Sequence, residues 1–236
     1  MTTPAAPIAL VTGTSSGIGQ AIAQRLLANG WQVHGLDFAP ASNLGEMFTS
    51  SVVDLTQSDP LENALSQILM NGTPQALVHA AGILRVGSLG ALNLNDGQHM
   101  WQLHVAAVTQ LANRILPLMH VAKQGRMVMV GSRVSGGIAG RSQYAASKAA
   151  LVSLARSWAA ESMEHGVTVN VVSPAATDTP MLQDPARANT KPKLPPIGRL
   201  IQPDEVAALV EYLLGPHAAA ITGQDIALCG GASVLR

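Results

Sequence analysis

The sequence predicts an α/β fold: a doubly wound parallel sheet with helices on both faces. Short apolar runs alternate with segments of helical length, and each run is continuously apolar instead of alternating with polar residues. Continuous runs indicate strands buried on both faces, and the alternation of strands with helices indicates parallel pairing. No stretch of linker composition divides the 236 residues, so 1–236 is expected to form a single domain.

The apolar runs and the helical segments place the elements along the chain. The predicted strands occupy 8–13, 32–37, 76–82, 126–132 and 167–174. The predicted helices occupy 17–30, 59–72, 100–120 and 142–162. The first two helices end at Asn-Gly and the second begins at Ser-Asp-Pro, which are typical stop and start signals. The tract 183–203 is irregular and rich in proline, which suggests a substrate flap at least as well as a disordered linker.

Composition and patterning exclude several classes of protein. Charged residues make up 12% of the chain, hydrophobic residues make up 47%, and the formal net charge is +0, which suits a compact globule and not a nucleic-acid binder. The single cysteine excludes an internal disulfide framework, and no spacing of cysteine and histidine indicates a metal site. There is no signal-peptide pattern and no apolar run of membrane-spanning length, so a cytoplasmic protein that binds no membrane is expected.

Three glycines follow the first predicted strand. Gly13 ends the strand, and Gly17 and Gly19 open the next helix. Glycines in this order let the backbone approach a pyrophosphate at the helix N-terminus, although a plain strand-to-helix turn also uses glycine. The spacing Gly-x3-Gly-x-Gly differs from the common dinucleotide fingerprint, so it supports nucleotide binding only together with other residues.

Asp37 closes the second predicted strand, about twenty residues after the glycine loop. A carboxylate there accepts hydrogen bonds from the hydroxyl groups of an adenosine ribose, and it repels a phosphate on that ribose. No arginine or lysine occupies 14–16 or follows Asp37 directly, so NAD is favoured over NADP. The alternative is a solvated aspartate at the end of a strand.

Tyr144 and Lys148 lie four residues apart, and Ser132 ends the preceding strand. Residues at i and i+4 share a helix face, and an ammonium beside a phenol favours the phenolate. Tyr144 would then move a proton to or from a substrate oxygen, while the Ser132 hydroxyl donates a hydrogen bond to the same oxygen. The pair alone is weak evidence, because tyrosine and lysine also meet by chance on helices.

These residues, in this order, resemble the classical short-chain dehydrogenase/reductases over nearly the whole chain. The motifs that carry the resemblance are "TGTSSGIG" at 12–19, Asp37, "VVDLT" at 52–56, "HAAG" at 79–82, Ser132, "YAASK" at 144–148 and "SPAATDTPM" at 173–181. The resemblance implies one Rossmann-like domain that uses NAD or NADP. It also implies a Ser-Tyr-Lys centre assisted by an asparagine, and assembly as homotetramers or homodimers through helices such as 143–162.

The resemblance also implies individual contacts. Asp54 and Leu55 would flank the adenine, Thr177 and Thr179 would contact the nicotinamide carboxamide, and Lys148 would hold the nicotinamide ribose. The implied catalytic residues are Ser132, Tyr144 and Lys148. The whole implied cofactor site comprises Gly13, Ser16, Gly17, Ile18, Gly19, Asp37, Asp54, Leu55, Ala81, Gly82, Tyr144, Lys148, Pro174, Thr177 and Thr179.

The chain departs from the family pattern at several positions. His104 stands where the family has the catalytic asparagine, so it is included among the catalytic candidates. It could anchor a water through a ring nitrogen or titrate near neutrality; the alternative is a packed helix histidine. His79 replaces an asparagine that supports the central strands, and Ala175 replaces a glycine. The serine lies one residue closer to the tyrosine than is usual, with Ser135 a weaker substitute.

The tracts "AAGILR" at 80–85 and "VVSPAATDTPM" at 171–181 look most like the branch that oxidises 2,3-dihydro-2,3-dihydroxybenzoate. Arg85, Arg133 and Arg141 are all expected near the carboxyl ends of strands, where they could clamp a substrate carboxylate. Arginines on surface loops are also common.

Three functions follow from these observations. The first is an NAD-dependent oxidoreductase that acts on CH–OH or CH–CH groups of a small alcohol or dihydrodiol. The second is a reductase of 3-oxoacyl thioesters, against which Asp37 argues because such reductases commonly use NADP. The third is a sensor or scaffold that binds NAD without turnover, suggested by His79 and His104 and disfavoured by the intact Ser-Tyr-Lys set.

Overall fold

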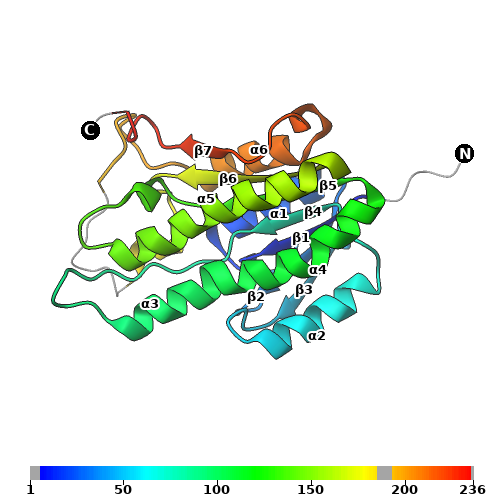
Figure 1. The fold of residues 1–236 in the computed structure, drawn as a ribbon, viewed down its shortest axis with the longest axis horizontal. Helices are drawn as coiled ribbons and strands as arrows, with labels where there is room; N and C mark the ends of the chain where they lie inside the picture. Colours follow the sequence, from blue (N-terminus) through cyan, green and yellow to red (C-terminus); the bar gives the residue numbers. More distant parts are fainter. Residues whose placement is uncertain (1–5, 185–192, 235–236) are drawn as a thin grey trace, which may run out of the picture.

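The computed structural model describes residues 6–184 and 193–234, which form a seven-stranded, fully parallel sheet (Figure 1). The strand order is β3-β2-β1-β4-β5-β6-β7, so the order reverses between β1 and β4. The strands are β1 (Ile8–Thr12), β2 (Gln32–Asp37), β3 (Phe48–Val52), β4 (Ala76–His79), β5 (Gly125–Val130), β6 (Val167–Pro174) and β7 (Asp225–Leu228). The predicted α/β fold with a doubly wound sheet is confirmed.

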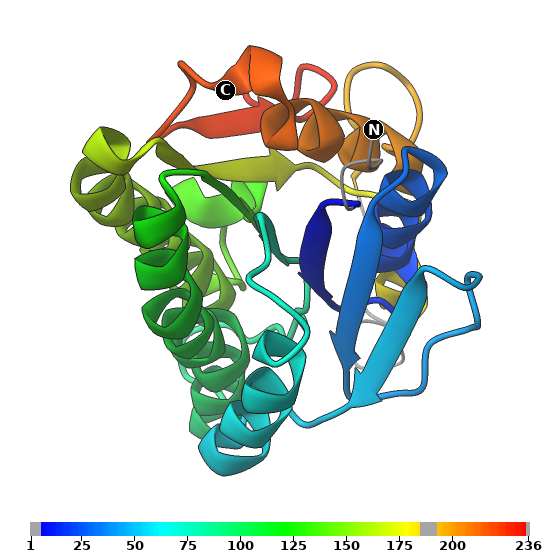
Figure 2. The ribbon, with the colours of Figure 1, turned by 90° about the vertical axis from the view of Figure 1, so that its right-hand side faces the viewer.

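Helices cover both faces of the sheet (Figure 2). The α-helices are α1 (Gly17–Ala28), α2 (Ser58–Leu69), α3 (Leu94–Trp101), α4 (Ala107–Ala122), α5 (Ser142–Ser162) and α6 (Pro203–Leu214). The 3₁₀ turns are η2 (Arg133–Gly136), η3 (Met163–His165), η4 (Pro180–Gln183) and η6 (Pro216–Ala218). A π-helical turn, η1 (Gln102–Ala106), joins α3 to α4. None of the described helices is long and apolar enough to cross a membrane.

The central strands divide their side chains between two hydrophobic cores, because neighbouring residues of a strand point to opposite faces. Leu10, Leu77 and Met127 are register partners across β1, β4 and β5, and they pack with α2, α4 and α5. The next row of the same strands packs instead with α1 and α6. This two-sided burial explains why the strand sequences are continuously apolar.

The structure adds elements that the periodicity did not predict. β3 was not predicted, and it is a half-exposed edge strand of sequence "FTSSV". α6 was not predicted either, and the expected helix over 100–120 begins earlier, at Leu94, and contains the π-turn. Of the expected flap at 183–203, residues 185–192 lie outside the described residues, and Pro203 already belongs to α6.

Replacing Leu77 with alanine should lower the free energy of unfolding by about 2–5 kcal/mol, because the change leaves a cavity between the central strands and the helices. The measurement is the shift in denaturation midpoint in urea. The matched control is Leu89→Ala, since Leu89 is 88% exposed and its truncation removes no core contact. Equal midpoints for the two variants would contradict this account of the core.

Candidate active site

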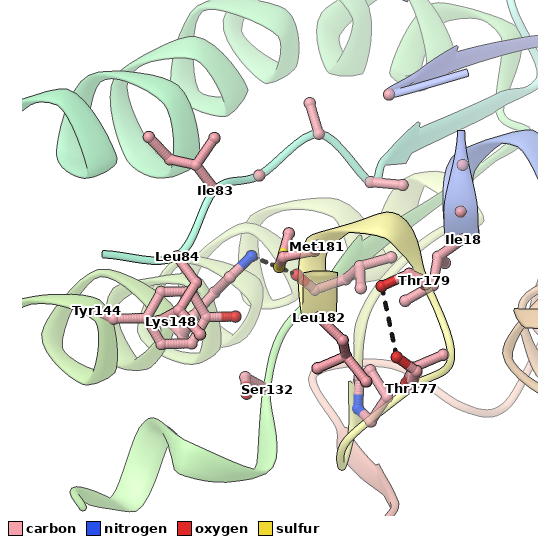
Figure 3. Close-up of a pocket in the computed structure, with 18 of the residues that line it drawn as sticks. Ile18, Ile83, Leu84, Ser132, Tyr144, Lys148, Thr177, Thr179, Met181 and Leu182 are labelled. Carbon is pink, nitrogen blue, oxygen red and sulfur yellow. Dashed lines mark hydrogen bonds between the residues drawn. The ribbon is translucent and has the colours of Figure 1, made fainter. Parts of the chain in front are cut away.

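A cavity of about 1030 Å³ opens at the carboxyl ends of the central strands. It is lined by residues that follow β1, β4 and β5 and that end β2 and β6, and it includes the point where the strand order reverses. Such a reversal separates neighbouring loops and leaves a crevice for a ligand. In Figure 3, Ser132, Tyr144 and Lys148 gather on one side, and Thr177 and Thr179 lie on the other with Met181 and Leu182 between.

The glycine loop forms one wall of this cavity. Gly13 has φ +79°, and a Cβ there would lie 2.8 Å from the backbone nitrogen of Ala81. A side chain at Gly13 would therefore clash with the segment after β4 and would be strained in the left-handed region. The N-terminus of α1 faces the cavity through Gly17, Ile18 and Gly19, which fits the pyrophosphate of a nicotinamide cofactor.

Two aspartates, Asp37 and Asp54, also line the cavity. Asp37 accepts hydrogen bonds from the backbone N–H groups of Ser15 (2.8 Å to Oδ2) and Ala39 (3.0 Å to Oδ1). Asp54 Oδ1 accepts from the N–H (2.9 Å) and the hydroxyl (2.7 Å) of Thr56. Both carboxylates are thus held in place at the wall where the adenosine of such a cofactor would lie.

Tyr144 and Lys148 are both buried in α5. Lys148 Nζ donates to the carbonyl of Val130, at the end of β5, over 2.9 Å and lies 5.9 Å from the centre of the Tyr144 ring. Burial lowers the pKa of Lys148 to about 7. Ser132 Oγ accepts from the N–H of Val134 (3.4 Å), so its own hydroxyl proton remains available for a substrate oxygen. All three residues line the same cavity.

His104 lies in the π-turn η1, behind Tyr144. Ser147 Oγ donates to the carbonyl of Tyr144 (2.8 Å), so His104 Nδ1–H must be the donor in its 2.9 Å bond to Ser147 Oγ. His104 Nε2 then accepts from the N–H of Ile83 (3.1 Å). Burial, with the nearby charge of Lys148, holds the pKa of His104 well below its ordinary value.

This geometry corrects the expectation for His104. Both ring nitrogens are engaged and the side chain does not line the cavity, so it offers no nitrogen to a water and does not titrate near neutrality. Its ring instead links Ile83, in the segment after β4, to Ser147 of α5, the residue before Lys148. His104 is therefore not among the described residues that line the cavity.

His79, which stands in place of the expected asparagine, forms a hydrogen bond with Thr12. Thr12 Oγ1 accepts from the N–H groups of Ala80 and Ala81 (3.1 Å each), so its hydroxyl donates to His79 Nδ1 over 3.0 Å. This bond links the ends of β1 and β4. Burial lowers the pKa of His79 to about 3, with a smaller contribution from Lys148. The ring therefore stays neutral at physiological pH.

Nearly all the residues predicted from the sequence line this one cavity. They are Gly13, Ser16, Gly17, Ile18, Gly19, Asp37, Asp54, Leu55, Ala81, Gly82, Ser132, Arg133, Arg141, Tyr144, Lys148, Pro174, Thr177 and Thr179. Besides His104, the exception is Arg85, whose Nη1 pairs with Asp184 Oδ2 at 2.8 Å and donates to the Leu84 carbonyl. Arg85 is thus engaged in an internal ion pair outside the cavity wall, contrary to its expected role with the substrate.

The apolar side of the cavity was not predicted from the sequence. Its members are Ile83, Leu84, Leu103, Val134, Ile138, Met181, Leu182, Leu194, Pro195 and Pro196. They come from five separate segments of the chain, so no local motif joins them. Met181 and Leu182, before the undescribed residues, and Leu194, Pro195 and Pro196, after them, are among these members.

The chain is similar to known proteins over nearly its whole length. A family model described as enoyl-(acyl carrier protein) reductase matches residues 13–233. The chain belongs to the classical short-chain dehydrogenase/reductase family. It is therefore an oxidoreductase that acts on CH–OH groups with a pyridine nucleotide cofactor, and the family resemblance seen in the sequence is confirmed.

Relatives in this family span the whole chain. The 3-oxoacyl-[acyl-carrier-protein] reductase FabG of Vibrio cholerae is 35% identical over 95% of this chain and 96% of its own length, and that of Escherichia coli is 34% identical over the same shares. A solved short-chain dehydrogenase/reductase family protein is 31% identical, covers 97% of this chain and 98% of its own, and superposes with a TM-score of 0.89. An actinorhodin polyketide ketoreductase with NADPH is 28% identical, with 99% of both chains covered and a TM-score of 0.89.

These relatives do not support the closer resemblance to the dihydrodihydroxybenzoate branch, because the curated proteins named above are 3-oxoacyl reductases. The short tracts at 80–85 and 171–181 that suggested the branch include cofactor-site residues such as Ala81, Pro174 and Thr177, which line the cavity. Sequence similarity at positions that are expected to bind the cofactor carries little information about the substrate.

The buried Lys148 makes stability depend on pH. Burial lowers the pKa of Lys148 to about 7 in the folded chain, below its ordinary value of 10.5. Between these values unfolding takes up a proton, so the free energy of unfolding rises with pH by up to about 1.4 kcal/mol per pH unit. Denaturation of the cofactor-free protein at pH 7 to 10 should show this rise in the wild type and lose it in Lys148→Met. The exposed Lys123→Met is the control, and parallel curves for Lys148→Met and wild type would contradict the assignment.

Proposed function

We propose that this protein reduces 3-oxoacyl thioesters, converting the 3-oxo group to a 3-hydroxyl group. The observation that carries the proposal is the apolar end of the cavity, which continues from Tyr144 between Leu84, Val134 and Met181. An acyl chain would bury its apolar surface there while its carbonyl meets Tyr144 and Ser132. The names and full-length coverage of the curated relatives support the same substrate class.

Each group around the substrate carbonyl has a separate role in its reduction. The nicotinamide, when bound, supplies a hydride to the carbonyl carbon. The Tyr144 hydroxyl gives its proton to the carbonyl oxygen, and the Ser132 hydroxyl donates a hydrogen bond to that oxygen as charge develops on it. The Lys148 ammonium, fixed by the Val130 carbonyl, favours the phenolate that Tyr144 becomes.

His104 and Ser147 hold this arrangement in place. The Ser147 hydroxyl donates to the backbone carbonyl of Tyr144, and His104 connects Ser147 to the backbone N–H of Ile83, in the segment after β4. A neutral histidine suits this task because a charged ring would repel Lys148.

Tyr144→Phe should lower kcat by at least about 100-fold, because it removes the group that transfers the proton. The rate of cofactor oxidation with 3-oxobutyryl thioester measures this, and cofactor affinity should stay within a few-fold. The chain has two tyrosines, and Tyr212→Phe, at the half-exposed Tyr212 of α6, serves as control and should leave kcat unchanged. A Tyr144→Phe enzyme with near wild-type kcat would contradict the proposed role.

We also propose that NAD is preferred over NADP. The two oxygens of Asp37 are fixed by Ser15 and Ala39, and the aspartate lines the cavity beside Phe38 with no basic side chain next to it in sequence. A ribose phosphate would meet this fixed negative charge. The solved actinorhodin polyketide ketoreductase was determined with NADPH, so membership of the family does not decide the preference.

Asp37→Asn should shift the ratio of kcat/KM for NAD over NADP toward NADP by about tenfold or more, equivalent to about 1.4 kcal/mol. The substitution removes the charge and keeps one acceptor oxygen. Steady-state kinetics with both cofactors measure the ratio, and Asp59→Asn, on the exposed start of α2, is the control. An unchanged ratio in Asp37→Asn would show that another feature sets the preference.

A second candidate is oxidation of a small carboxylated alcohol or dihydrodiol. Arg133 and Arg141 line the cavity and favour this activity, because guanidinium groups bind carboxylates.

Assembly as a homodimer or homotetramer remains a prediction.

A further inference from the structure

Asp37, Asp54, Arg133 and Arg141 line different sides of the cavity, whose lining also includes Lys148 and Lys193. The carboxylates, Asp37 and Asp54, lie at the ends of β2 and β3, on one side of the strand-order reversal. Arg133 and Arg141 lie on the other side, between β5 and α5, in the segment that also carries Ser132 and Tyr144. The substrate end is therefore cationic as well as apolar, while the adenosine end is anionic.

The two arginines lack a charged partner within the described part of the chain. Both are half-buried, and neither forms a salt bridge with a described carboxylate. Arg133 Nη1 donates to the carbonyl of Ala232 (3.3 Å), which orients the guanidinium without neutralising it. Arg85 provides the contrast, because its charge is already balanced by Asp184.

We propose that Arg133 and Arg141 form an anion subsite that binds a carboxylate or phosphate group carried by the substrate. The subsite rests on the proposed function and narrows it to thioesters with an oxyanion. A guanidinium presents parallel N–H donors that match two oxygens of such a group, and partial burial strengthens the pairing. The oxyanion has two sources: a carboxylate on the acyl chain, or a phosphate of the arm that holds the thioester.

Three thioesters with the same 3-oxo group separate these sources. They are the neutral 3-oxobutyryl-N-acetylcysteamine, 3-oxobutyryl-coenzyme A, and a 3-oxoacyl-N-acetylcysteamine with a terminal carboxylate on its acyl chain. The wild type should show a kcat/KM about tenfold or more higher for at least one anionic thioester than for the neutral one. The anionic thioester that gains identifies the source.

Arg133→Gln, Arg141→Gln and the double variant should lower the ratio of kcat/KM for the preferred anionic thioester to kcat/KM for the neutral one. Arg156→Gln, an exposed arginine of α5 outside the cavity, should keep the full preference. The wild-type preference should also fall as ionic strength rises, since salt screens charge pairs that are partly exposed.

The results separate this inference from the proposed function. Turnover of all three thioesters at equal kcat/KM, or a preference that persists in the double variant, would overturn the anion subsite and leave the reductase function standing. If none is turned over, the proposed function fails. Calorimetric titration of the three thioesters into protein saturated with oxidised cofactor then decides the subsite: a preference lost in the double variant supports it, and equal wild-type affinities overturn it.

Discussion

The ammonium of Lys148 is buried between α5 and the end of β5, where the carbonyl of Val130 is its hydrogen-bond acceptor. Removing this cation from water costs free energy, and two neighbouring groups offset part of that cost. The carboxyl end of β5 supplies an acceptor, and the facing aromatic ring of Tyr144 lies one turn away on the same helix. Because β5 and α5 are joined through Ser132, the same geometry fixes the serine, the tyrosine and the lysine relative to one another.

The two buried histidines extend this arrangement to the segment after β4. His79 and His104 are held in opposite tautomers by Thr12 and Ser147, and both stay neutral beside the lysine. His79 bonds Thr12, whose hydroxyl oxygen accepts from the N–H groups of Ala80 and Ala81, and His104 accepts from the N–H of Ile83. These bonds connect the segment after β4, beside which a nicotinamide would lie, to β1 and to α5. At two positions where the chain departs from the family pattern, imidazole nitrogens thus form these hydrogen bonds.

Much of the fold was predictable because the central strands are buried on both faces, which leaves continuous apolar runs in the sequence. β3 escaped prediction because an edge strand such as "FTSSV" has polar, half-exposed side chains. The proximity of Tyr144 and Lys148 was predictable from local spacing, since they are one helical turn apart. The pairing of Arg85 with Asp184, 99 residues away, and the apolar substrate end depend on contacts between distant loops, which no local pattern records.

The central claim is that this reaction centre reduces the 3-oxo group of a thioester. The most direct measurement is the consumption of reduced nicotinamide cofactor by the purified protein with 3-oxobutyryl thioester, with the product identified by mass spectrometry. In parallel, oxidised cofactor is supplied with cyclic dihydrodiols and carboxylated alcohols. The account predicts cofactor oxidation matched by formation of the 3-hydroxy thioester, and little reduction of cofactor with the dihydrodiols. Dihydrodiol oxidation without any thioester reduction would contradict it.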